Sequence, residues 1–186
     1  FGSSILGYDT VAREAVAHPE HALWNETEFV RALETPARYG FHATLKPPFA
    51  LAPGATEAGL LDRAETLSAR WAPIYLPALA VVPLGDFVAL RPLAEDAELD
   101  RLAAACVREL DDLRAPLGAE DRMRRVSQSL TPRQHANLDL WGYPYVLEDF
   151  RFHMTLTGAV PEPLQLRAIE VLKQLYRRVG ASVCID

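Results

Sequence analysis

The chain has 186 residues, which suits one large domain or two small fused lobes and excludes a multi-domain assembly. Hydrophobic residues make up 49% and charged residues 24%, a composition that allows a sizeable core and excludes intrinsic disorder. The 19 Lys and Arg against 25 Asp and Glu give a net charge of −6. Because such a charge repels the phosphate backbone, it disfavours a general nucleic-acid coat protein.

Helical periodicity recurs along the chain. The clearest start signal is the capping box of Thr131 and Gln134, with Pro132 at the first helical position. Thr56 can cap an earlier helix in the same way. In chain order, the predicted helices cover Glu26–Leu33, Glu57–Arg70, Asp96–Leu113, Pro132–Trp141 and Pro163–Val179.

Strand patterns lie between these helices, and Pro or Gly bounds most of them. The predicted strands cover Phe41–Leu45, Ile74–Val82, Phe87–Pro92, Phe150–Thr157 and Ser182–Asp186. They give the order strand, helix, strand, strand from Phe41 to Pro92, and strand, helix, strand from Phe150 onward. If the halves are duplicates, a last strand is missing after Asp186. The sequence also opens at Phe1 without an initiator Met, so we expect both termini to be incomplete.

This order predicts an α+β fold in one bilobal domain over residues 1–186. Lobe one is centred on 36–92 and lobe two on 145–186, as a pseudo-twofold duplicated unit of antiparallel sheets with outer helices around a central cleft.

No segment of the sequence predicts a membrane helix or a disulfide framework. The longest apolar stretch, Ile74–Leu84, contains two prolines and is far shorter than the roughly 20 residues that a membrane helix needs. Cys106 and Cys184 match no metal or redox spacing. The default expectation is a reduced, cytoplasmic protein.

The sharpest signal is a repeated pentapeptide: Phe41-His42-Ala43-Thr44-Leu45 recurs as Phe152-His153-Met154-Thr155-Leu156. Side chains alternate between the two faces of a strand, so Phe, the middle residue and Leu of each copy face the core. Each His and Thr then share the opposite face. We expect these two faces to meet across the cleft.

The same alternation adds a cation to each copy. Lys46 shares a face with His42 and Thr44, and Arg151 shares a face with His153, Thr155 and Thr157. Because imidazole exchanges a proton near neutral pH, one ring can act as base while the other acts as acid. The hydroxyl groups and the cations can hold the phosphate oxygens of a metal-free phosphodiester site.

Several of these residues have a plain structural alternative. Lys46 precedes two prolines and can simply be solvated, and Arg151 can pair with Glu148 or Asp149. Tyr39 falls on the core side, although Gly40 can rotate it toward the cleft. The segment Trp141–Tyr145, with Tyr143 and Tyr145, is either a packed connection or a wall for the organic part of a ligand.

Other chemistries lack their motifs. The sequence has no G-x-x-x-x-G-K, G-x-G-x-x-G, H-E-x-x-H or G-x-S-x-G. A catalytic zinc needs three protein ligands, and nothing is spaced to join His42 and His153. We therefore expect no metal and no cofactor.

The paired H-x-T motifs resemble the two-histidine phosphoesterase superfamily, which includes RNA ligase-like cyclic phosphodiesterases. The segments Arg38–Lys46, Trp141–Tyr145 and Phe150–Gly158 resemble a branch named for phosphonate metabolism. The resemblance implies a bilobal fold without a metal, with His42 and His153 as the acid–base pair and Thr44 and Thr155 as phosphate-holding residues. Lys46, Arg151, Tyr39, Tyr143 and Tyr145 are the expected substrate-binding residues.

The leading hypothesis is a hydrolase that opens a small cyclic phosphodiester of a ribose phosphate, such as 5-phosphoribosyl 1,2-cyclic phosphate. One alternative is an enzyme that acts on RNA ends bearing a cyclic phosphate, against which the acidic net charge argues. Another is a non-catalytic sensor of a phosphorylated ligand. Which histidine is the base stays open at this point.

Overall fold

The computed structural model describes residues 1–126, 129–179 and 183–185, and it divides into two compact units. Unit one consists of Phe1–Ala43, Tyr75–Glu95 and His153–Ile185. Unit two contains Thr44–Ile74 and Asp96–Phe152. Each unit is therefore assembled from segments that are distant in the sequence.

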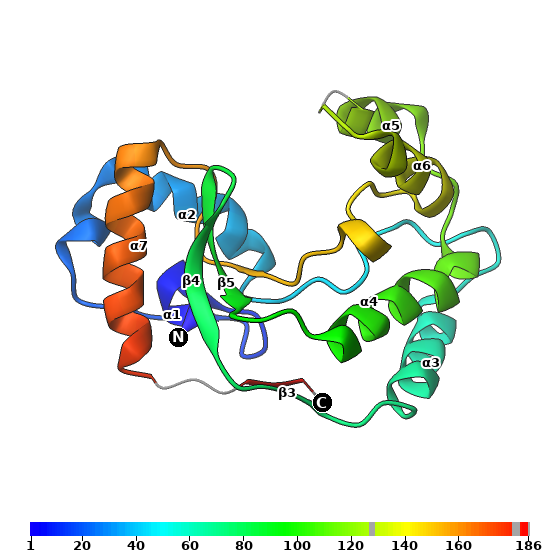
Figure 1. Ribbon diagram of the computed structural model, residues 1–186, viewed down its shortest axis with the longest axis horizontal. Coiled ribbons are helices and arrows are strands. Elements are labelled where there is room, and N and C mark those ends of the chain that lie inside the picture. Colours follow the sequence, from blue (N-terminus) through cyan, green and yellow to red (C-terminus); the bar gives the residue numbers. More distant parts are fainter. Residues whose placement is uncertain (127–128, 180–182, 186) are drawn as a thin grey trace. The chain divides into compact units, whose positions relative to one another are not determined.

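Unit one combines a small sheet with three α-helices, α1 (Gly2–Leu6), α2 (Thr27–Tyr39) and α7 (Glu162–Arg177). The sheet has the order β4 (Leu79–Leu84), β5 (Phe87–Pro92), β6 (Met154–Thr155), and both pairings are antiparallel. Figure 1 shows α7 beside β4, which it contacts. The remaining elements of unit one are β1 (Tyr8–Asp9), β2 (Glu14–Ala15), the 3-10 helix η1 (Ala22–Asn25) and β7 (Val183–Ile185). Strand β7 pairs with β3 (Ile74–Leu76), of which Tyr75 and Leu76 belong to unit one and Ile74 to unit two.

Unit two is helical. It contains α3 (Glu57–Ser68), α4 (Ala97–Glu109), α5 (Ala119–Val126), α6 (Pro132–Trp141) and the 3-10 helices η2 (Asp111–Leu113) and η3 (Leu147–Asp149). Helix α3 contacts α4, and α5 contacts α6. The predicted capping box of Thr131 and Gln134 is confirmed at the start of α6, and Thr56 caps α3 as expected.

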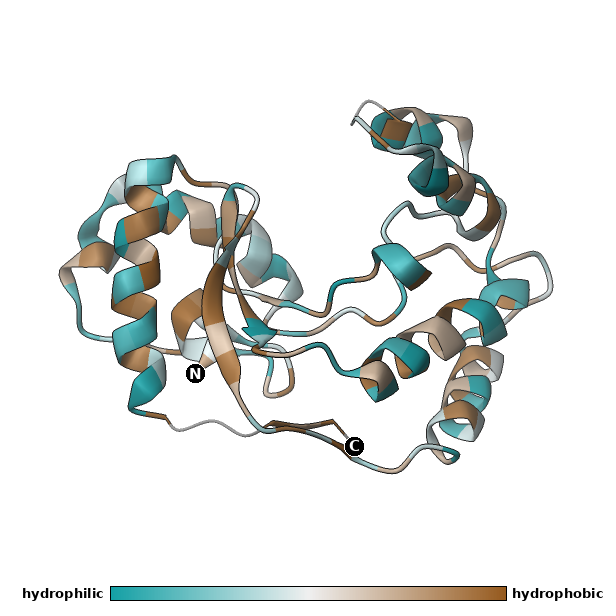
Figure 2. Ribbon diagram, viewed as in Figure 1, coloured by the Kyte–Doolittle hydropathy of each residue, from teal (hydrophilic) through white to brown (hydrophobic). Residues whose placement is uncertain are grey.

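A row of core residues crosses one face of the sheet in unit one. The antiparallel register aligns Val81, Leu90 and Met154 across the three strands, and each is at most 7% exposed. Figure 2 shows β4 hydrophobic along most of its length, whereas α7 alternates between hydrophobic and hydrophilic residues. The buried side chains of α7 include Leu164, Ala168, Ile169 and Leu172, at the spacing of an amphipathic helix.

The predicted α+β class with antiparallel strands is confirmed. The pseudo-twofold duplication and the lobes over 36–92 and 145–186 stay predictions. Among the described helices, none is long and apolar enough to span a bilayer.

Several predicted boundaries differ from the structure, and prolines lie at two of them. The expected strand Ile74–Val82 is broken between β3 and β4, where Pro77 has no N–H to donate to a strand ladder. Helix α2 extends beyond the expected end at Leu33 and includes Pro36. Gly180, which follows the predicted helix Pro163–Val179, and the ends of the predicted strand Ser182–Asp186 lie outside the described residues.

Helix α2 tolerates Pro36 because another segment uses the carbonyl that the proline leaves without a partner. A residue at position 36 would normally donate its N–H to the Ala32 oxygen, and proline cannot. That oxygen instead accepts a 2.7 Å hydrogen bond from the Gly158 N–H. A Cβ atom on Gly158 would stand 2.8 Å from the Ala32 oxygen, so only glycine fits without a shift. This contact ties the chain after the second H-x-T motif to α2.

Candidate functional site

The second pentapeptide shows the predicted alternation. Phe152, Met154 and Leu156 are 6%, 7% and 0% exposed, whereas His153 and Thr155 are half-buried. The apolar residues therefore face the core, and His153 and Thr155 lie on the opposite face of the sheet. Only Met154–Thr155 forms a strand, shorter than the predicted Phe150–Thr157.

The middle residues of the two pentapeptides pair with each other within unit one. Ala43 forms an isolated antiparallel bridge with Met154. Continuing this register by one residue places His42 opposite Thr155, and opposite residues in an antiparallel pair project to the same face. The strand predicted over Phe41–Leu45 is thus reduced to a single bridge, preceded by a glycine turn and followed by Pro47 and Pro48.

The face that carries the histidines extends across β5. The pairs Ala89–Thr155 and Leu90–Met154 define the register, and its continuation places Arg91 opposite His153. The ring of Phe87, on the same side of β5, lies 5.8 Å from the His153 ring between centroids. The Arg91 Nε atom is buried and has no hydrogen-bond partner among the described residues.

Sequence reasoning did not include Arg91 among the site residues. The available signal was an arginine in the otherwise apolar strand Phe87–Pro92. Arg91 follows Phe87 by four positions and Ala89 by two, so the three residues share one face of the strand. Its position beside His153 depends on which strand pairs with which, and alternation within one strand does not give that information.

His42 is oriented by the turn before it. Gly40 ends α2 with φ 72° and ψ 179°, a conformation open to glycine, and a Cβ there would stand 1.9 Å from Thr10 Cγ2. The His42 Nδ1 atom lies 3.0 Å from the Gly40 oxygen. A carbonyl oxygen only accepts, so Nδ1 is the protonated nitrogen and, in the neutral ring, Nε2 carries the lone pair.

Thr157 is a structural residue, although alternation had put it on the face of His153. It is completely buried, and its Oγ1 accepts a 3.0 Å hydrogen bond from the Val88 N–H. The Val88 oxygen in turn accepts from both the Leu156 and the Thr157 N–H groups. This doubled contact interrupts the regular ladder, so strict alternation of faces cannot be extended to position 157.

Lys46 belongs to unit two, where it is buried rather than solvated. Its side chain is 7% exposed, and Nζ donates to Asp111 Oδ1 at 3.1 Å and to the Val107 oxygen at 2.9 Å. Val107 lies in the last turn of α4, so the ammonium group also satisfies a carbonyl at the helix C-terminus. Burial lowers the pKa of Lys46, even though Asp111 opposes this effect.

Asp111 connects Lys46 to Arg114, whose Nε and Nη2 atoms donate to the two carboxylate oxygens at 2.8 and 3.0 Å. Partial burial opposes ionisation of the Asp111 carboxyl group, but hydrogen bonds from Arg114 and Lys46 outweigh it and lower the pKa. Two cations therefore share one carboxylate.

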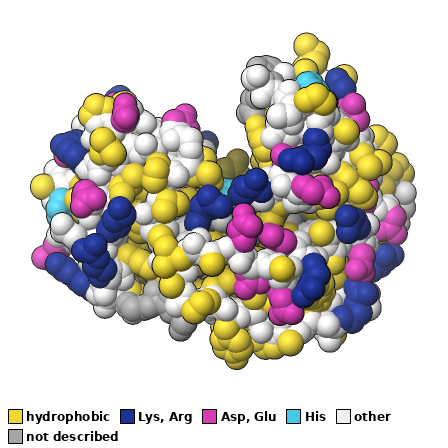
Figure 3. Space-filling model, in the orientation of Figure 1, with side chains coloured by type: hydrophobic (Ala, Val, Ile, Leu, Met, Phe, Trp, Pro, Cys, Tyr) yellow, Lys and Arg dark blue, Asp and Glu magenta, His cyan; other side chains and the backbone are white. Residues whose placement is uncertain are grey.

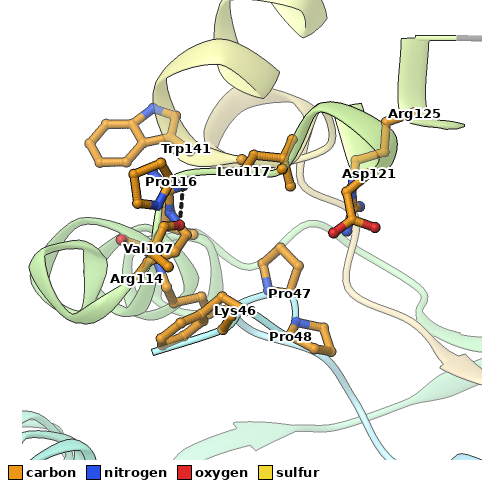
Figure 4. Close-up of a pocket in the computed structure, with 15 residues that line it drawn as sticks. Lys46, Pro47, Pro48, Val107, Arg114, Pro116, Leu117, Asp121, Arg125 and Trp141 are labelled. Carbon is orange, nitrogen blue, oxygen red and sulfur yellow. Dashed lines mark hydrogen bonds between the residues drawn. The ribbon is translucent and has the colours of Figure 1, made fainter. Parts of the chain in front are cut away.

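This cluster borders a cavity of about 280 Å³ within unit two. Figure 4 shows Lys46 and Arg114 on one side and Asp121 and Arg125 on the other, with Trp141 above Pro116. Trp141, from the predicted aromatic segment, thus lines a cavity.

The other expected substrate-binding residues are placed as follows. Tyr143 and Tyr145 are in contact in unit two, and the Arg125 guanidinium lies 4.8 Å from the Tyr143 ring centroid. Arg151, also in unit two, donates to the backbone oxygens of Glu148 and Phe150. Tyr39 ends α2 in unit one and is 67% exposed. Thr44 is the first residue of unit two and is half-buried. Their proposed binding roles stay predictions.

The charged surface is mixed. Figure 3 shows cationic and anionic side chains interspersed over the visible face. Arg122 pairs with Asp139, and Arg124 pairs with Asp121, so much of the basic charge on α5 is locally balanced. In the part of the chain that the structure describes, no three His, Cys, Asp or Glu side chains gather in a group that could hold a metal ion.

Two curated proteins resemble this chain closely. The ribose 1,5-bisphosphate phosphokinase PhnN of Janthinobacterium sp. (strain Marseille) is 47% identical over 123 residues, which are 66% of this chain and 27% of that protein. The protein of the same name from Laribacter hongkongensis (strain HLHK9) is 39% identical over 161 residues, or 87% of this chain and 37% of that protein. The chain therefore corresponds to well under half the length of these relatives.

No solved structure matches the chain. A family model described as "Protein of unknown function (DUF1045)" matches residues 44–186, from the first H-x-T threonine through the whole second motif. Because this match covers more than half of the sequence, the chain belongs to the DUF1045 family.

Proposed function

We propose that this chain is a metal-independent phosphodiesterase that opens a small cyclic phosphodiester of a ribose phosphate, in phosphonate metabolism. The observation that carries the proposal is the bridge between Ala43 and Met154, which aligns the two H-x-T motifs so that His42 stands opposite Thr155. Two imidazoles and a hydroxyl group on one sheet face are the groups that acid–base cleavage of a phosphodiester requires.

His42 is the base and His153 the acid in this proposal. The hydrogen bond from His42 Nδ1 to the Gly40 oxygen leaves the lone pair of the neutral ring on Nε2, where it can accept a proton from water. The water oxygen then forms a bond to phosphorus, and the bond between phosphorus and the ribose oxygen breaks. The imidazolium of His153 donates its proton to the departing oxygen, while Thr155 holds a phosphate oxygen.

The names of the relatives support a particular substrate. Hydrolysis of 5-phosphoribosyl 1,2-cyclic phosphate with departure of the 2-oxygen yields ribose 1,5-bisphosphate, the compound in the name of both relatives. This direction of ring opening would supply a phosphokinase with its substrate. Because the chain lacks G-x-x-x-x-G-K and matches 27% and 37% of the relatives, we assign their kinase activity to the rest of their length.

The test is hydrolysis of 5-phosphoribosyl 1,2-cyclic phosphate and of a nucleoside 2′,3′-cyclic phosphate, with and without a chelator. Phosphorus NMR identifies the product. We expect the first substrate to give ribose 1,5-bisphosphate in the presence of chelator, and His42→Ala and His153→Ala each to lower kcat about 10²–10⁴-fold.

His135→Ala, in α6 of unit two, is the control histidine and should retain wild-type turnover. Near-normal activity of either site variant would refute the two-histidine mechanism. Loss of activity with chelator would instead favour a metal enzyme, and turnover of the nucleoside substrate alone would favour action on RNA ends.

A further inference from the structure

Arg91 stands beside the candidate acid on the sheet face that carries both motifs. Its strand, β5, pairs with β6 at Ala89–Thr155 and Leu90–Met154, and the next position in this register sets Arg91 opposite His153. Directly opposite residues of an antiparallel pair project to the same side, with Cβ atoms about 4.5–5.5 Å apart. The side chains of Arg91 and His153 therefore project from the same face of the sheet.

Two neighbouring rows of residues define this face. One row runs Val82, Ala89, Thr155 and His42, and the next runs Ala80, Arg91 and His153. All seven residues belong to unit one. Ala80, Val82 and Ala89 have small apolar side chains. The polar side chains of these two rows are therefore those of His42, His153, Thr155 and Arg91.

The Arg91 side chain has a donor that the protein leaves unused. Its Nε atom is buried, and no hydrogen-bond acceptor for it lies within residues 1–126, 129–179 and 183–185. Withdrawing part of a charged guanidinium from water without an acceptor is costly, and native proteins normally supply an acceptor from protein, water or ligand. A phosphate oxygen bound between His153 and Thr155 would be such an acceptor.

Resting on the proposed function, we propose that Arg91 binds the non-bridging phosphate oxygens of the substrate. Guanidinium presents parallel N–H donors that match two oxygens of a phosphate, and it stays charged at every working pH. The ligand class is thus a compact phosphate ester or phosphate itself. In the sequence analysis, Lys46 was expected to bind substrate; in unit two its ammonium group donates to Asp111 and to the Val107 oxygen.

Binding of inorganic phosphate tests the site without requiring turnover. In a ¹H–¹⁵N spectrum of the full chain, the Nε–H resonance of Arg91 should shift as phosphate is added, and calorimetry should give the dissociation constant. We expect Arg91→Ala to weaken phosphate binding about ten- to a hundredfold, and Arg91→Lys to recover part of the loss because it keeps the charge but not the two parallel donors.

Arg31→Ala is the charge-matched control, since Arg31 is an exposed residue of α2 in the same unit. It should bind phosphate like the wild type. Circular dichroism checks that each variant is folded; if Arg91→Ala does not fold, the Arg91→Lys titration and the wild-type Nε–H shift decide the question alone.

The outcomes separate this inference from the function on which it rests. If His42→Ala abolishes hydrolysis but Arg91→Ala and Arg91→Lys bind phosphate and turn over like the wild type, Arg91 is not the phosphate ligand and the hydrolase proposal stands. If phosphate binding depends on Arg91 while no cyclic phosphate is hydrolysed, the anion site stands and the hydrolase proposal fails. No phosphate binding by the wild type would overturn the inference.

Discussion

Ala43 and Met154, the middle residues of the two matching pentapeptides, pair with each other in an antiparallel bridge. The two motifs are separated by more than a hundred positions in the chain, yet the structure pairs their middle residues within unit one. The duplicated order of elements had predicted that the motifs lie in two lobes and face each other across a cleft. Lateral pairing provides another way to bring the polar sides of both motifs together, because neighbouring strands share their faces.

The alternation in β6 should separate stability from activity at adjacent positions. Met154 is 7% exposed and faces the core, so Met154→Ala should lower the free energy of unfolding by about 2–5 kcal/mol. His153 is half-buried on the other face of the sheet. His153→Ala should change the free energy of unfolding by about 1 kcal/mol or less, while it removes hydrolysis. Urea unfolding and turnover measured on both variants check this. Equal destabilisation by the two substitutions would contradict the assigned faces.

Gly158 should be intolerant of even a methyl group. A Cβ at this position would stand 2.8 Å from the Ala32 oxygen, whose hydrogen bond from the Gly158 N–H compensates for Pro36. We expect Gly158→Ala to cost about 1–3 kcal/mol. Gly118→Ala is the matched control, because nothing lies within 4 Å of its Cβ position, and it should stay within about 0.5 kcal/mol of wild type. Thermal unfolding that ranks the two variants alike would argue against the contact.

The charge cluster of unit two should respond asymmetrically to neutralisation. Asp111→Asn leaves the buried Lys46 ammonium and the Arg114 guanidinium without their carboxylate, and should cost about 3 kcal/mol or more. Lys46→Met leaves Asp111 paired to Arg114 through two hydrogen bonds, and should cost only about 1 kcal/mol. Denaturant unfolding of both variants at neutral pH is the measurement. A larger loss for Lys46→Met would mean that the ammonium group, and not the carboxylate, organises the cluster.

Asp149 should make the protein sensitive to acid. Hydrogen bonds from Arg133, and also from Gln134, lower the pKa of Asp149, whose side chain is 9% exposed. A carboxyl group with a lowered folded pKa contributes stability that is complete above its unfolded value of about 3.9 and is lost as the pH falls through the folded value.

We therefore expect Asp149→Asn to reduce the free energy of unfolding at pH 7 more than at pH 3, which flattens the acid part of the stability curve. Urea titrations from pH 7 to pH 3 provide the curve. Arg133→Gln removes the main partner and should flatten the same region. Wild-type and variant curves that run parallel would rule out Asp149 as a source of the acid sensitivity.

Sequence patterns predicted correctly those elements whose ends depend on residues close in the sequence. The capping box of Thr131 and Gln134 is present because both side chains bond to backbone groups within one helical turn. Strand β5 has the predicted bounds, Phe87–Pro92. Prolines were harder to predict: Pro77 interrupts a strand, whereas Pro36 is accommodated inside α2 by Gly158, a partner 122 positions away that no local pattern reveals.

By itself, the sequence determined which residues of the second motif share a face. His153 and Thr155 lie on one face, and Phe152, Met154 and Leu156 lie on the other, because successive side chains of an extended chain point in opposite directions. Only the tertiary structure decided which faces meet. The bridge of Ala43 with Met154, the pairing of β5 with β6 that puts Arg91 on the face of His153, and the salt bridge of Lys46 with Asp111 each join distant segments. Such contacts depend on packing over the whole unit, and side-chain periodicity within one strand carries no information about it.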